Sequence, residues 1–415
     1  MRTTTALSIY ILCGNATYNR GDRANLTAQL DLLRSVYPDA QITVGSFRPE
    51  VDARWYDATF VQRGCILSAS QWKAMRSADI IIWGGGSLLT DHTGILSIPY
   101  WFCLLLLIKI FLHKPVMAWA QGLVIHTILG AFFAKRVFSL VDIATVRDHD
   151  SYLIAKRLSA KKVQITETAD PAILLEGTSL QKGESILREQ GIPTDKPLIG
   201  VTPTFWPLYH RTYDLLPYAI ARRWGLRKHR GQKKIMELLS AYQASMDLLI
   251  EHLNCNILLL PRYANDPWPD ITYLRQLKRS SKHPERVYLI EADTYAPKEY
   301  FSLWHHFSCL LSGTMHDCIV ACAVGTPCVH IVYEKKGEEF SRAAGMQDYV
   351  LPLEEFLTPQ GQEKAAELVR RCVALRKEKM QMREECRMRL RKLAEKNLEI
   401  FDTLVERALT PSHEH

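Results

Sequence analysis

The chain has 415 residues, of which 47% are hydrophobic and 23% are charged, and its formal net charge is +8. This length fits two domains, and the composition excludes an extensively disordered chain. Much of the positive charge lies between residues 370 and 396, where eleven Lys or Arg and four Glu give +7. This stretch has no aromatic residues, so we predict a solvated helix face and no nucleic-acid binding. A surface that binds phosphate or an anionic membrane is the alternative.

The cysteines and the N-terminal residues bear on the compartment. None of the ten cysteines forms a CxxC pair, which disfavours structural zinc and a disulfide framework and favours a reducing compartment. The apolar run at 6–12 is too short for a secretory signal. We therefore expect a cytoplasmic protein, with contact at the inner face of the membrane as the alternative. The sequence does not indicate an oligomeric state.

The first half of the chain alternates short apolar runs with longer helical patterns, which is typical of parallel sheets with crossover helices. Strands are predicted at 7–13, 41–45, 80–83, 116–120 and 143–146. Helices are predicted at 23–36, 70–76, 99–112, 128–138 and 150–158. The run at 100–112 is strongly apolar but too short to span a bilayer, so we predict a buried helix packed on a sheet, with monotopic membrane contact as the alternative.

The second half repeats this alternation after a segment rich in charged and turn residues. Strands are predicted at 198–201, 256–260, 287–290, 309–311 and 329–332. Helices are predicted at 234–253, 300–307, 317–323 and 362–395. We therefore predict two Rossmann-like domains at 1–178 and 197–360, a linker at 179–196, and basic C-terminal helices at 361–415. Ligands should bind in the cleft where the carboxyl ends of both sets of strands face each other.

Polar and glycine-rich motifs follow several predicted strands of the first half. The segment 13–22 carries Asn19 and Asp22, whose side chains suit helix capping and ligand binding equally well. Gly84, Gly85 and Gly86 allow a close approach of the chain to a bound molecule, or a tight turn. Ala-Gln-Gly at 120–122, Val-Arg-Asp at 146–148 and Ala-Asp-Pro at 169–171 also follow strands or lie near the same sheet edge.

The segment 311–317, Leu-Ser-Gly-Thr-Met-His-Asp, places His316 at a strand-to-helix junction. A histidine there lies near the positive end of the helix and exchanges protons around neutral pH. Gly-Thr-Pro at 325–327 and Tyr-Glu-Lys-Lys at 333–336 follow. From residue types alone, a single histidine is more often structural than catalytic.

These motifs occur in an order and spacing that resemble the polysaccharide pyruvyl transferase family over residues 7–350. The resemblance implies a GT-B-like α/β fold, with two domains facing a cleft and a C-terminal helical segment. It also implies transfer of the enolpyruvyl group of phosphoenolpyruvate to hydroxyls of a saccharide, free or lipid-linked, with a cyclic ketal as product and phosphate released. No cofactor and no metal are implied beyond the donor substrate. His316 corresponds to the motif histidine of the family, as a general acid or a phosphate ligand.

The resemblance also implies which residues line the two halves of the cleft. The donor carries a carboxylate and a phosphate, so cationic groups should surround it. The donor-side candidates are Arg262, His210, Arg211, Lys335, Ser312 and Gly313. The acceptor-side candidates are Asn19, Asp22, Gly84, Gly85, Gly86 and Asp91. Trp206 and Tyr209 would stack on a sugar or pack into the domain interface.

Two positions depart from the family pattern. Thr314 stands where the family usually has Arg, and Arg23 stands where it usually has an acidic residue. Because the first departure removes an anion contact, either another cation replaces it or the donor is different. The alternatives are therefore a GT-B glycosyltransferase that uses a nucleotide sugar and a catalytically silent saccharide-binding relative.

Overall fold

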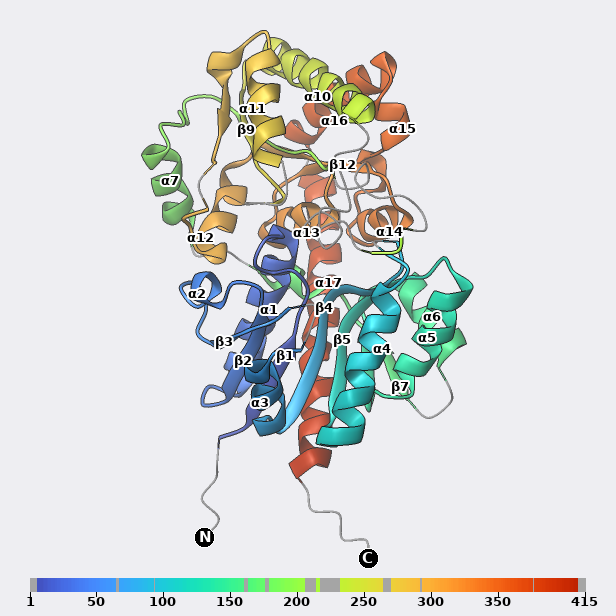
Figure 1. Cartoon of the computed structure of the whole chain (residues 1–415). Coiled ribbons are helices and arrows are strands. Elements are labelled where there is room, and N and C mark those ends of the chain that lie inside the picture. Colours follow the sequence, from blue (N-terminus) through green and yellow to red (C-terminus); the bar gives the residue numbers. More distant parts are fainter. Residues whose placement is uncertain are drawn as a thin grey trace, which may run out of the picture.

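The computed structural model describes residues 6–64, 67–92, 94–159, 163–175, 179–205, 214–216, 232–263, 270–291, 293–375 and 377–409. Within these ranges the chain forms two lobes, one above the other in Figure 1. Each lobe is built around one parallel β-sheet. The predicted pair of parallel-sheet lobes is thereby confirmed.

Seven parallel strands form the sheet of the lower lobe, in the order β3-β2-β1-β4-β5-β6-β7. They are β1 (Ser8–Leu12), β2 (Gln41–Ser46), β3 (Thr59–Gln62), β4 (Ile80–Thr90), β5 (Val116–Val124), β6 (Ile143–Val146) and β7 (Gln164–Glu167). Ile9 of the central strand β1 lies in register with Ile42 on one side and Ile80 on the other. The strand order reverses between β1 and β4, and ligands of open α/β sheets bind at such switch points.

Six parallel strands form the sheet of the upper lobe, in the order β10-β9-β8-β11-β12-β13. They are β8 (Leu198–Thr202), β9 (Asn256–Leu259), β10 (Val287–Leu289), β11 (Cys309–Ser312), β12 (Cys328–Val332) and β13 (Val350–Pro352). The order reverses between β8 and β11, so the carboxyl end of β11 reaches a switch point immediately before His316. The two switch points belong to different lobes, and the site described below joins them.

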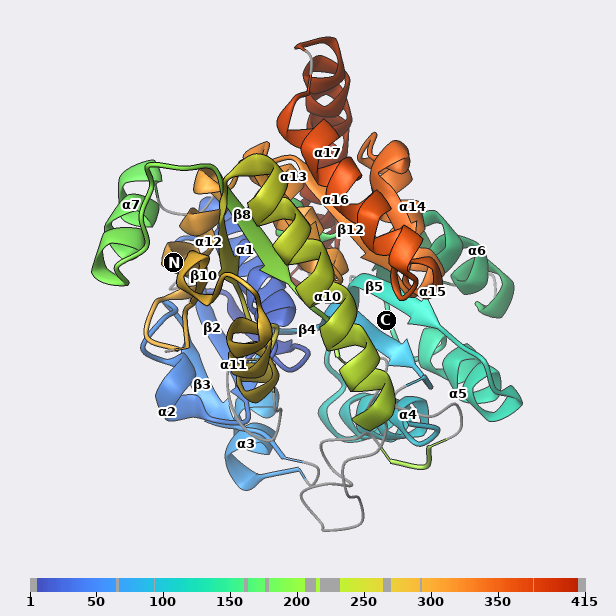
Figure 2. The same cartoon turned by 90° about the horizontal axis from the view of Figure 1, so that it is seen from above.

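Helices cover both faces of each sheet and bury four apolar clusters against them. The lower lobe carries α1 (Arg20–Val36), α2 (Pro49–Asp52), α3 (Ala69–Ser77), α4 (Ser97–Leu107), η1 (Ile108–Leu112), α5 (Ile128–Phe138), α6 (His149–Leu158) and η2 (Pro171–Leu174). The rest of the chain carries α7 (Leu180–Glu189), α10 (Gln232–Leu253), α11 (Asp270–Ser280), η3 (Pro284–Arg286), α12 (Pro297–Phe301), η4 (Ser302–His306), α13 (Met315–Val324), α14 (Lys335–Ala343), η5 (Gln347–Tyr349), α15 (Leu353–Phe356), α16 (Pro359–Val373) and α17 (Lys377–Leu409). In Figure 2, α10 and α16 lie side by side over the upper sheet.

All ten predicted strands are present, and three further strands were not predicted from the sequence. These are β3, β7 and β13, which lie at sheet edges. Edge strands are short and half-exposed, and the sequences Thr-Phe-Val-Gln, Gln-Ile-Thr-Glu and Val-Leu-Pro contain no long apolar run. The segment at 179–196, which we expected to connect the domains, contains the helix α7, whose buried Ile186 and Leu187 pack near η4.

The basic C-terminal stretch forms parts of two helices; the predicted solvated face is one side of α17, where Arg389 and Lys392 are exposed, and the other side is buried. Helix α17 runs from the upper lobe along the whole lower lobe in Figure 1. Leu390 packs in a cluster with upper-lobe residues, whereas Phe401 packs in a cluster of the lower lobe. The side-chain oxygen of Asn397 accepts hydrogen bonds from the hydroxyls of Thr145 (2.6 Å) and Thr168 (3.1 Å). One face of α17 therefore fastens the two lobes together.

The apolar run at 100–112 was predicted to be a buried helix, and this is correct for one of its faces only. It forms the end of α4 and the π-helical turn η1, which bury Trp101, Leu105 and Ile108 against the lower sheet. Ile110 and Phe111 point outward and are 52% and 62% exposed. Within the described residues, no helix combines the length and the apolar character that crossing a membrane requires.

Candidate active site between the lobes

The N-termini of α1 and α13 meet where the two lobes touch. Asn19 caps α1 by accepting hydrogen bonds from the backbone N–H groups of Gly21 (2.8 Å) and Asp22 (3.3 Å). Gly21 lies against the ring of His316 in α13, and a Cβ atom at Gly21 would be only 2.7 Å from Nδ1 of that ring. The glycine is therefore required by the close approach of the two helices rather than by its backbone conformation.

The Nε2 atom of His316 lies among polar groups supplied by the lower lobe. It is 3.1 Å from Nδ2 of Asn25, 3.4 Å from Nη1 of Arg147 and 3.6 Å from Oδ2 of Asp170. The Asn25 oxygen accepts from the Ala172 N–H at 3.3 Å, which turns the amide nitrogen toward the histidine. Because that nitrogen only donates, Nε2 accepts and the ring proton is on Nδ1.

The protonation of His316 follows from this environment. Burial lowers the pKa of the imidazole to about 3; the Asp170 carboxylate opposes this, while Arg147, Arg262 and Lys336 lower the pKa further. The ring is therefore neutral at pH 7. An anion bound beside it would raise its pKa, because the anion favours the charged imidazolium.

Arg147 is the cation that contacts both His316 and the segment that follows the glycine triplet. One of its Nη atoms forms an ion pair with Asp170 at 2.5 Å, and the other donates to the hydroxyl of Ser87 at 2.6 Å. Ser87 directly follows the glycine triplet. Arg147 itself is almost fully buried. Its guanidinium is therefore fixed in one orientation between β4 and His316.

The glycine triplet needs glycine for conformational reasons. Gly84, Gly85 and Gly86 have φ angles of 147°, 84° and 154°, which are unfavourable for residues with a side chain. A Cβ atom at Gly84 would lie 2.1 Å from the Trp119 carbonyl oxygen. A Cβ atom at Gly86 would lie 3.4 Å from a carboxylate oxygen of Asp22, which places the triplet beside the start of α1.

Asp22 and Arg262 face this region from opposite lobes. A carboxylate oxygen of Asp22 accepts from the Asn15 N–H at 2.8 Å, and burial raises the pKa of Asp22. Arg262 donates to the hydroxyls of Thr204 (3.1 Å) and Tyr333 (3.4 Å). Its positive charge acts to lower the pKa of both Asp22 and His316. Arg262 is thus brought to the site, as the sequence interpretation expected.

Ser312 and Gly313 form the turn that leads into α13. The Ser312 hydroxyl accepts from the Thr202 hydroxyl at 2.6 Å and from the Thr314 N–H at 3.0 Å, all within the buried interior. A Cβ atom at Gly313 would lie 2.8 Å from the Tyr242 hydroxyl. The Thr314 hydroxyl donates to Asp317 within the same turn. These residues shape the loop that carries His316 and direct their polar atoms toward one another.

Other residues predicted for the site have different places. Both carboxylate oxygens of Asp91 accept hydrogen bonds from the 126–127 segment that precedes α5, so Asp91 holds that loop in place.

Lys335 is 75% exposed and forms an ion pair with Asp150 at 2.6 Å, whereas the neighbouring Lys336 acts on the pKa of His316. Asn19 uses its amide for the α1 cap and for a 3.4 Å contact with the Tyr263 hydroxyl. His210, Arg211, Trp206 and Tyr209 lie outside the described residues.

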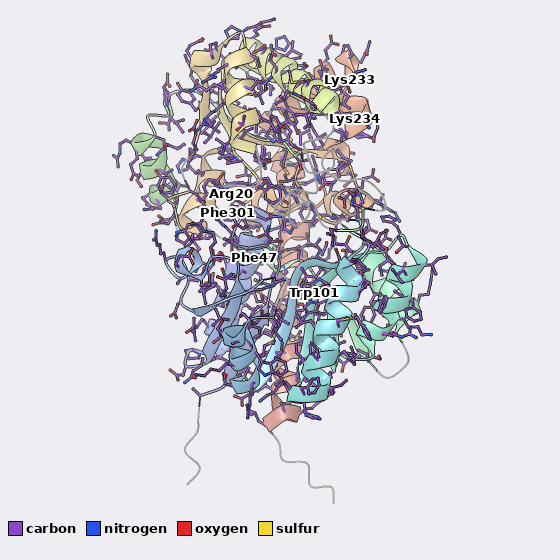
Figure 3. All side chains as sticks on the ribbon, in the orientation of Figure 1. Arg20, Phe47, Trp101, Lys233, Lys234 and Phe301 are labelled. Atoms are coloured by element: carbon purple, nitrogen blue, oxygen red, sulfur yellow. The ribbon has the colours of Figure 1, made fainter. Side chains whose placement is uncertain are left out.

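Arg23, one of the two departures from the family pattern, joins the lobes. Its guanidinium donates to both carboxylate oxygens of Asp293, at 2.6 and 2.7 Å. The adjacent Arg20 places its guanidinium carbon 3.6 Å from the centre of the Tyr300 ring. Figure 3 shows Arg20 beside Phe301, at the level where the lower and upper lobes meet. The arginine at position 23 therefore has a partner of opposite charge in the other lobe.

The sequence interpretation did not assign roles to three residues that surround His316. Arg147 and Asp170 were noticed in their motifs, and their position after β6 and β7 was the signal that could have placed them at the site. Asn25 gave a weaker signal, because asparagine is unfavourable inside a helix unless its side chain has another role. Among the described residues, no group of three His, Cys, Asp or Glu side chains is arranged to hold a metal ion.

The two facing switch points define the chain as a GT-B-like protein, and comparison with solved structures agrees. The UDP-GlcNAc 2-epimerase of Methanocaldococcus jannaschii matches with a TM-score of 0.57 at 11% identity, covering 96% of this chain and 100% of that one. The UDP-GlcNAc 2-epimerase of Neisseria meningitidis bound to UDP-GlcNAc matches with a TM-score of 0.54 at 14% identity, covering 96% and 99%. The wall teichoic acid polymerase TagF matches with a TM-score of 0.51 at 12% identity, covering 97% and 89%. At these identities the likeness establishes the fold alone.

The family is established by the sequence itself. The sequence profile of the polysaccharide pyruvyl transferases matches residues 19–335, which is most of the chain. The protein therefore belongs to the polysaccharide pyruvyl transferase family and is a transferase, as the resemblance implied. A search of curated proteins found no significant match.

Proposed function

We propose that the protein transfers the pyruvyl group of phosphoenolpyruvate to two hydroxyls of one saccharide unit, forming a ketal and releasing phosphate. The observation that carries this proposal is the neutral His316 ring, which is held between the lobes and acted on by the charges of Arg147, Arg262 and Lys336. Such a ring can take up a proton when an anionic donor arrives, and the cations complement the phosphate and carboxylate of that donor. Membership of the family supports the same chemistry.

The proposed reaction balances its protons in two steps. His316, protonated once the dianion is bound, delivers its proton to the methylene carbon of phosphoenolpyruvate. The first saccharide hydroxyl adds to the adjacent carbon, which carries the developing positive charge, and its proton passes to the His316 ring, which is neutral after the first transfer. The second hydroxyl then displaces phosphate from that carbon, so the ketal has two new C–O bonds. The proton of the second hydroxyl leaves with the phosphate.

In this proposal the upper lobe binds the donor and the lower lobe binds the acceptor. The upper lobe supplies His316 and Arg262, which face the donor. The lower lobe supplies Asp22 and the glycine triplet, where the backbone permits a close approach of the acceptor. Arg147 is paired with Asp170 and contacts His316, so in this proposal it orients the ring and its charge attracts the phosphate of the donor.

The test measures binding and product separately. Phosphoenolpyruvate should raise the unfolding temperature of the wild-type protein, because a ligand that binds only the folded state stabilises it. The shift should be smaller in His316→Gln and unchanged in His283→Gln, a partly exposed histidine beyond α11 in the upper lobe. Mass spectrometry of the saccharide should show addition of a pyruvate ketal with the wild type and with His283→Gln, but far less with His316→Gln.

Three other results would contradict the proposal. Stabilisation by uridine nucleotides but not by phosphoenolpyruvate would indicate a nucleotide-sugar glycosyltransferase. Stabilisation by a saccharide with no transfer from any donor would indicate a silent binding protein. Equal shifts in wild type and His316→Gln would remove His316 from the donor site.

A further inference from the structure

The outer face of α4, η1 and α5 exposes large apolar side chains that no other part of the described chain covers. Ile128 is 92% exposed, Phe111 62%, Ile110 52% and Phe132 48%. Leu96, Leu107 and Leu129 extend the same surface. These seven are nearly half of the fifteen large exposed apolar side chains of the described residues, and they all lie between positions 96 and 132. We call them the apolar face.

The side chains of the apolar face are exposed although the helices that carry them are well packed on their other sides. The opposite sides of α4 and α5 are fully buried against the lower sheet, with Leu105, Ile108 and Val137 in one cluster. The rings of Phe102 and Phe133 pack against each other at 5.2 Å and join the two helices. Scattered exposed apolar residues are ordinary, but a group of this size on neighbouring helices marks an interaction surface.

Most of the charged side chains around the apolar face are basic. Residues 92–141 contain four Lys or Arg and no Asp or Glu, although one of the four, Lys109, forms an ion pair with Asp142 just outside this range. Lys135 and Arg136 are exposed on α5, and the guanidinium carbon of Arg136 lies 3.4 Å from the centre of the Phe132 ring. Exposed Lys73 and Arg76 on α3 lie close by, because Trp72 of that helix contacts the Phe111 ring at 6.5 Å. The cations thus flank the aromatic side chains directly.

We propose that this face binds the surface of an anionic lipid bilayer. The apolar side chains would enter the boundary between headgroups and acyl chains, and the lysines and arginines would contact anionic headgroups. This is peripheral binding, consistent with the finding that no described helix can span a membrane. The face contains none of the residues around His316, so the inference does not depend on the proposed reaction.

A second copy of the chain fits this face less well than a bilayer. A twofold interface brings the same surface of both subunits together. Such an interface would bring two mostly basic surfaces together, and like charges across an interface repel each other. An anionic bilayer supplies the opposite charge and the apolar environment at once.

The position of the apolar face relative to the site indicates what membrane binding would contribute to the reaction. Asp91 fixes the 126–127 segment, and this places Ile128 at the start of α5, near the sheet edge that carries the site. The Ile95 and Leu96 N–H groups donate to the carbonyl oxygens of Asp214 and Leu215, at 2.8 and 3.2 Å. The α5 end of this face therefore lies on the side of the lower lobe to which the carboxyl ends of its strands point, the same side as the proposed acceptor residues.

The experiment is co-sedimentation of the full chain with phosphatidylcholine vesicles, with and without phosphatidylglycerol. We expect binding to the vesicles that contain phosphatidylglycerol, and weakening with added salt. The double variant Lys135→Glu/Arg136→Glu should bind the vesicles at least about tenfold more weakly, because each basic residue contributes substantially near an anionic surface. Ile128→Ser/Phe132→Ser should also lose binding, whereas Leu180→Ser/Met236→Ser, which changes exposed apolar residues elsewhere, should not.

Three outcomes decide the matter. Loss of binding in both α5 variants, with the control variant and the unfolding temperatures unchanged, supports the proposal. Failure of the wild type to sediment with phosphatidylglycerol vesicles overturns it. A dimer in light scattering that disappears in Ile128→Ser/Phe132→Ser would show that the face joins two copies, which also overturns it. Stabilisation by phosphoenolpyruvate should be the same in all variants, so this result is read independently of the proposed function.

Discussion

The upper lobe contains two buried histidines whose environments differ in kind. Burial lowers the pKa of both, to about 3 for His316 and about 4 for His330. His330 in β12 lies 2.9 Å from the Ser341 hydroxyl, and Ser341 and the hydrogen-bonding backbone of Gly337 both belong to α14 of its own lobe. His316 meets Asn25, Arg147 and Asp170, all from the other lobe.

The comparison teaches that a shifted pKa does not by itself mark a functional histidine. Both rings are neutral at pH 7, and both make well-defined hydrogen bonds. The difference is that the groups around His316 include the charged Arg147 and Asp170 and come from the facing lobe. His330 is enclosed by its own sheet and helix, so its polar contact stabilises the fold. Four predictions test this difference, from the largest effect to the smallest.

Replacing each histidine by glutamine should separate their roles most clearly. His316→Gln should reduce the rate of phosphate release in the presence of phosphoenolpyruvate and saccharide by roughly 10²–10⁴-fold, the usual contribution of a general acid or base. His330→Gln should keep a rate close to that of the wild type, since no described group of the site contacts it. Similar losses in both variants would show that burial, and not location, made His316 important.

The pH dependence of stability should reveal the buried neutral ring of His330. Its pKa is about 4 when folded and about 6.5 when unfolded, so the unfolded chain binds the proton more strongly below pH 6.5. The stabilisation is therefore complete above pH 6.5 and is lost as the pH falls toward 4, by about 2 kcal/mol at pH 5. Urea unfolding at pH 7.5 and pH 5 should show this loss in the wild type. A His330→Gln variant with the same pH dependence as the wild type would contradict the assignment.

Removing the hydroxyl that faces His330 should weaken the fold without affecting the reaction. Ser341→Ala leaves a ring nitrogen of a buried histidine without its partner, which costs about 1–3 kcal/mol. Ser35→Ala, which removes an exposed hydroxyl on α1, should change the free energy of unfolding by no more than about 0.5 kcal/mol. Urea titration of both variants provides the comparison. A rate loss in Ser341→Ala at unchanged stability would mean that the Ser341–His330 pair influences the site.

The sequence predicted the two-sheet architecture and the position of His316 because both leave local signals. Apolar runs that alternate with helical patterns identify central strands, and the turn from β11 into α13 carries recognisable glycine and histidine residues. The edge strands β3, β7 and β13 left no such run. The partners of His316 are equally invisible locally, because Asn25 is 291 positions away in the chain. The unexpected surface position of Lys335 follows from the direction of the first turn of α14, which residue types do not determine.

The smallest predicted effect concerns Asn25, which sets the proton position on His316. In Asn25→Asp one carboxylate oxygen can still accept from the Ala172 N–H, so the local fold is preserved. The other oxygen then faces Nε2 and accepts instead of donating, which moves the ring proton to Nε2 and raises the pKa of His316. Because His316 acts in its protonated form, we expect the alkaline limb of the pH–rate profile to shift to higher pH and the rate at neutral pH to rise about tenfold, since one pKa unit corresponds to one factor of ten. Asn254→Asp, at the end of α10, should leave the profile unchanged. A profile that is the same in Asn25→Asp and wild type would show that the lower lobe does not control the proton on His316, and the contrast with His330 would then rest on position alone.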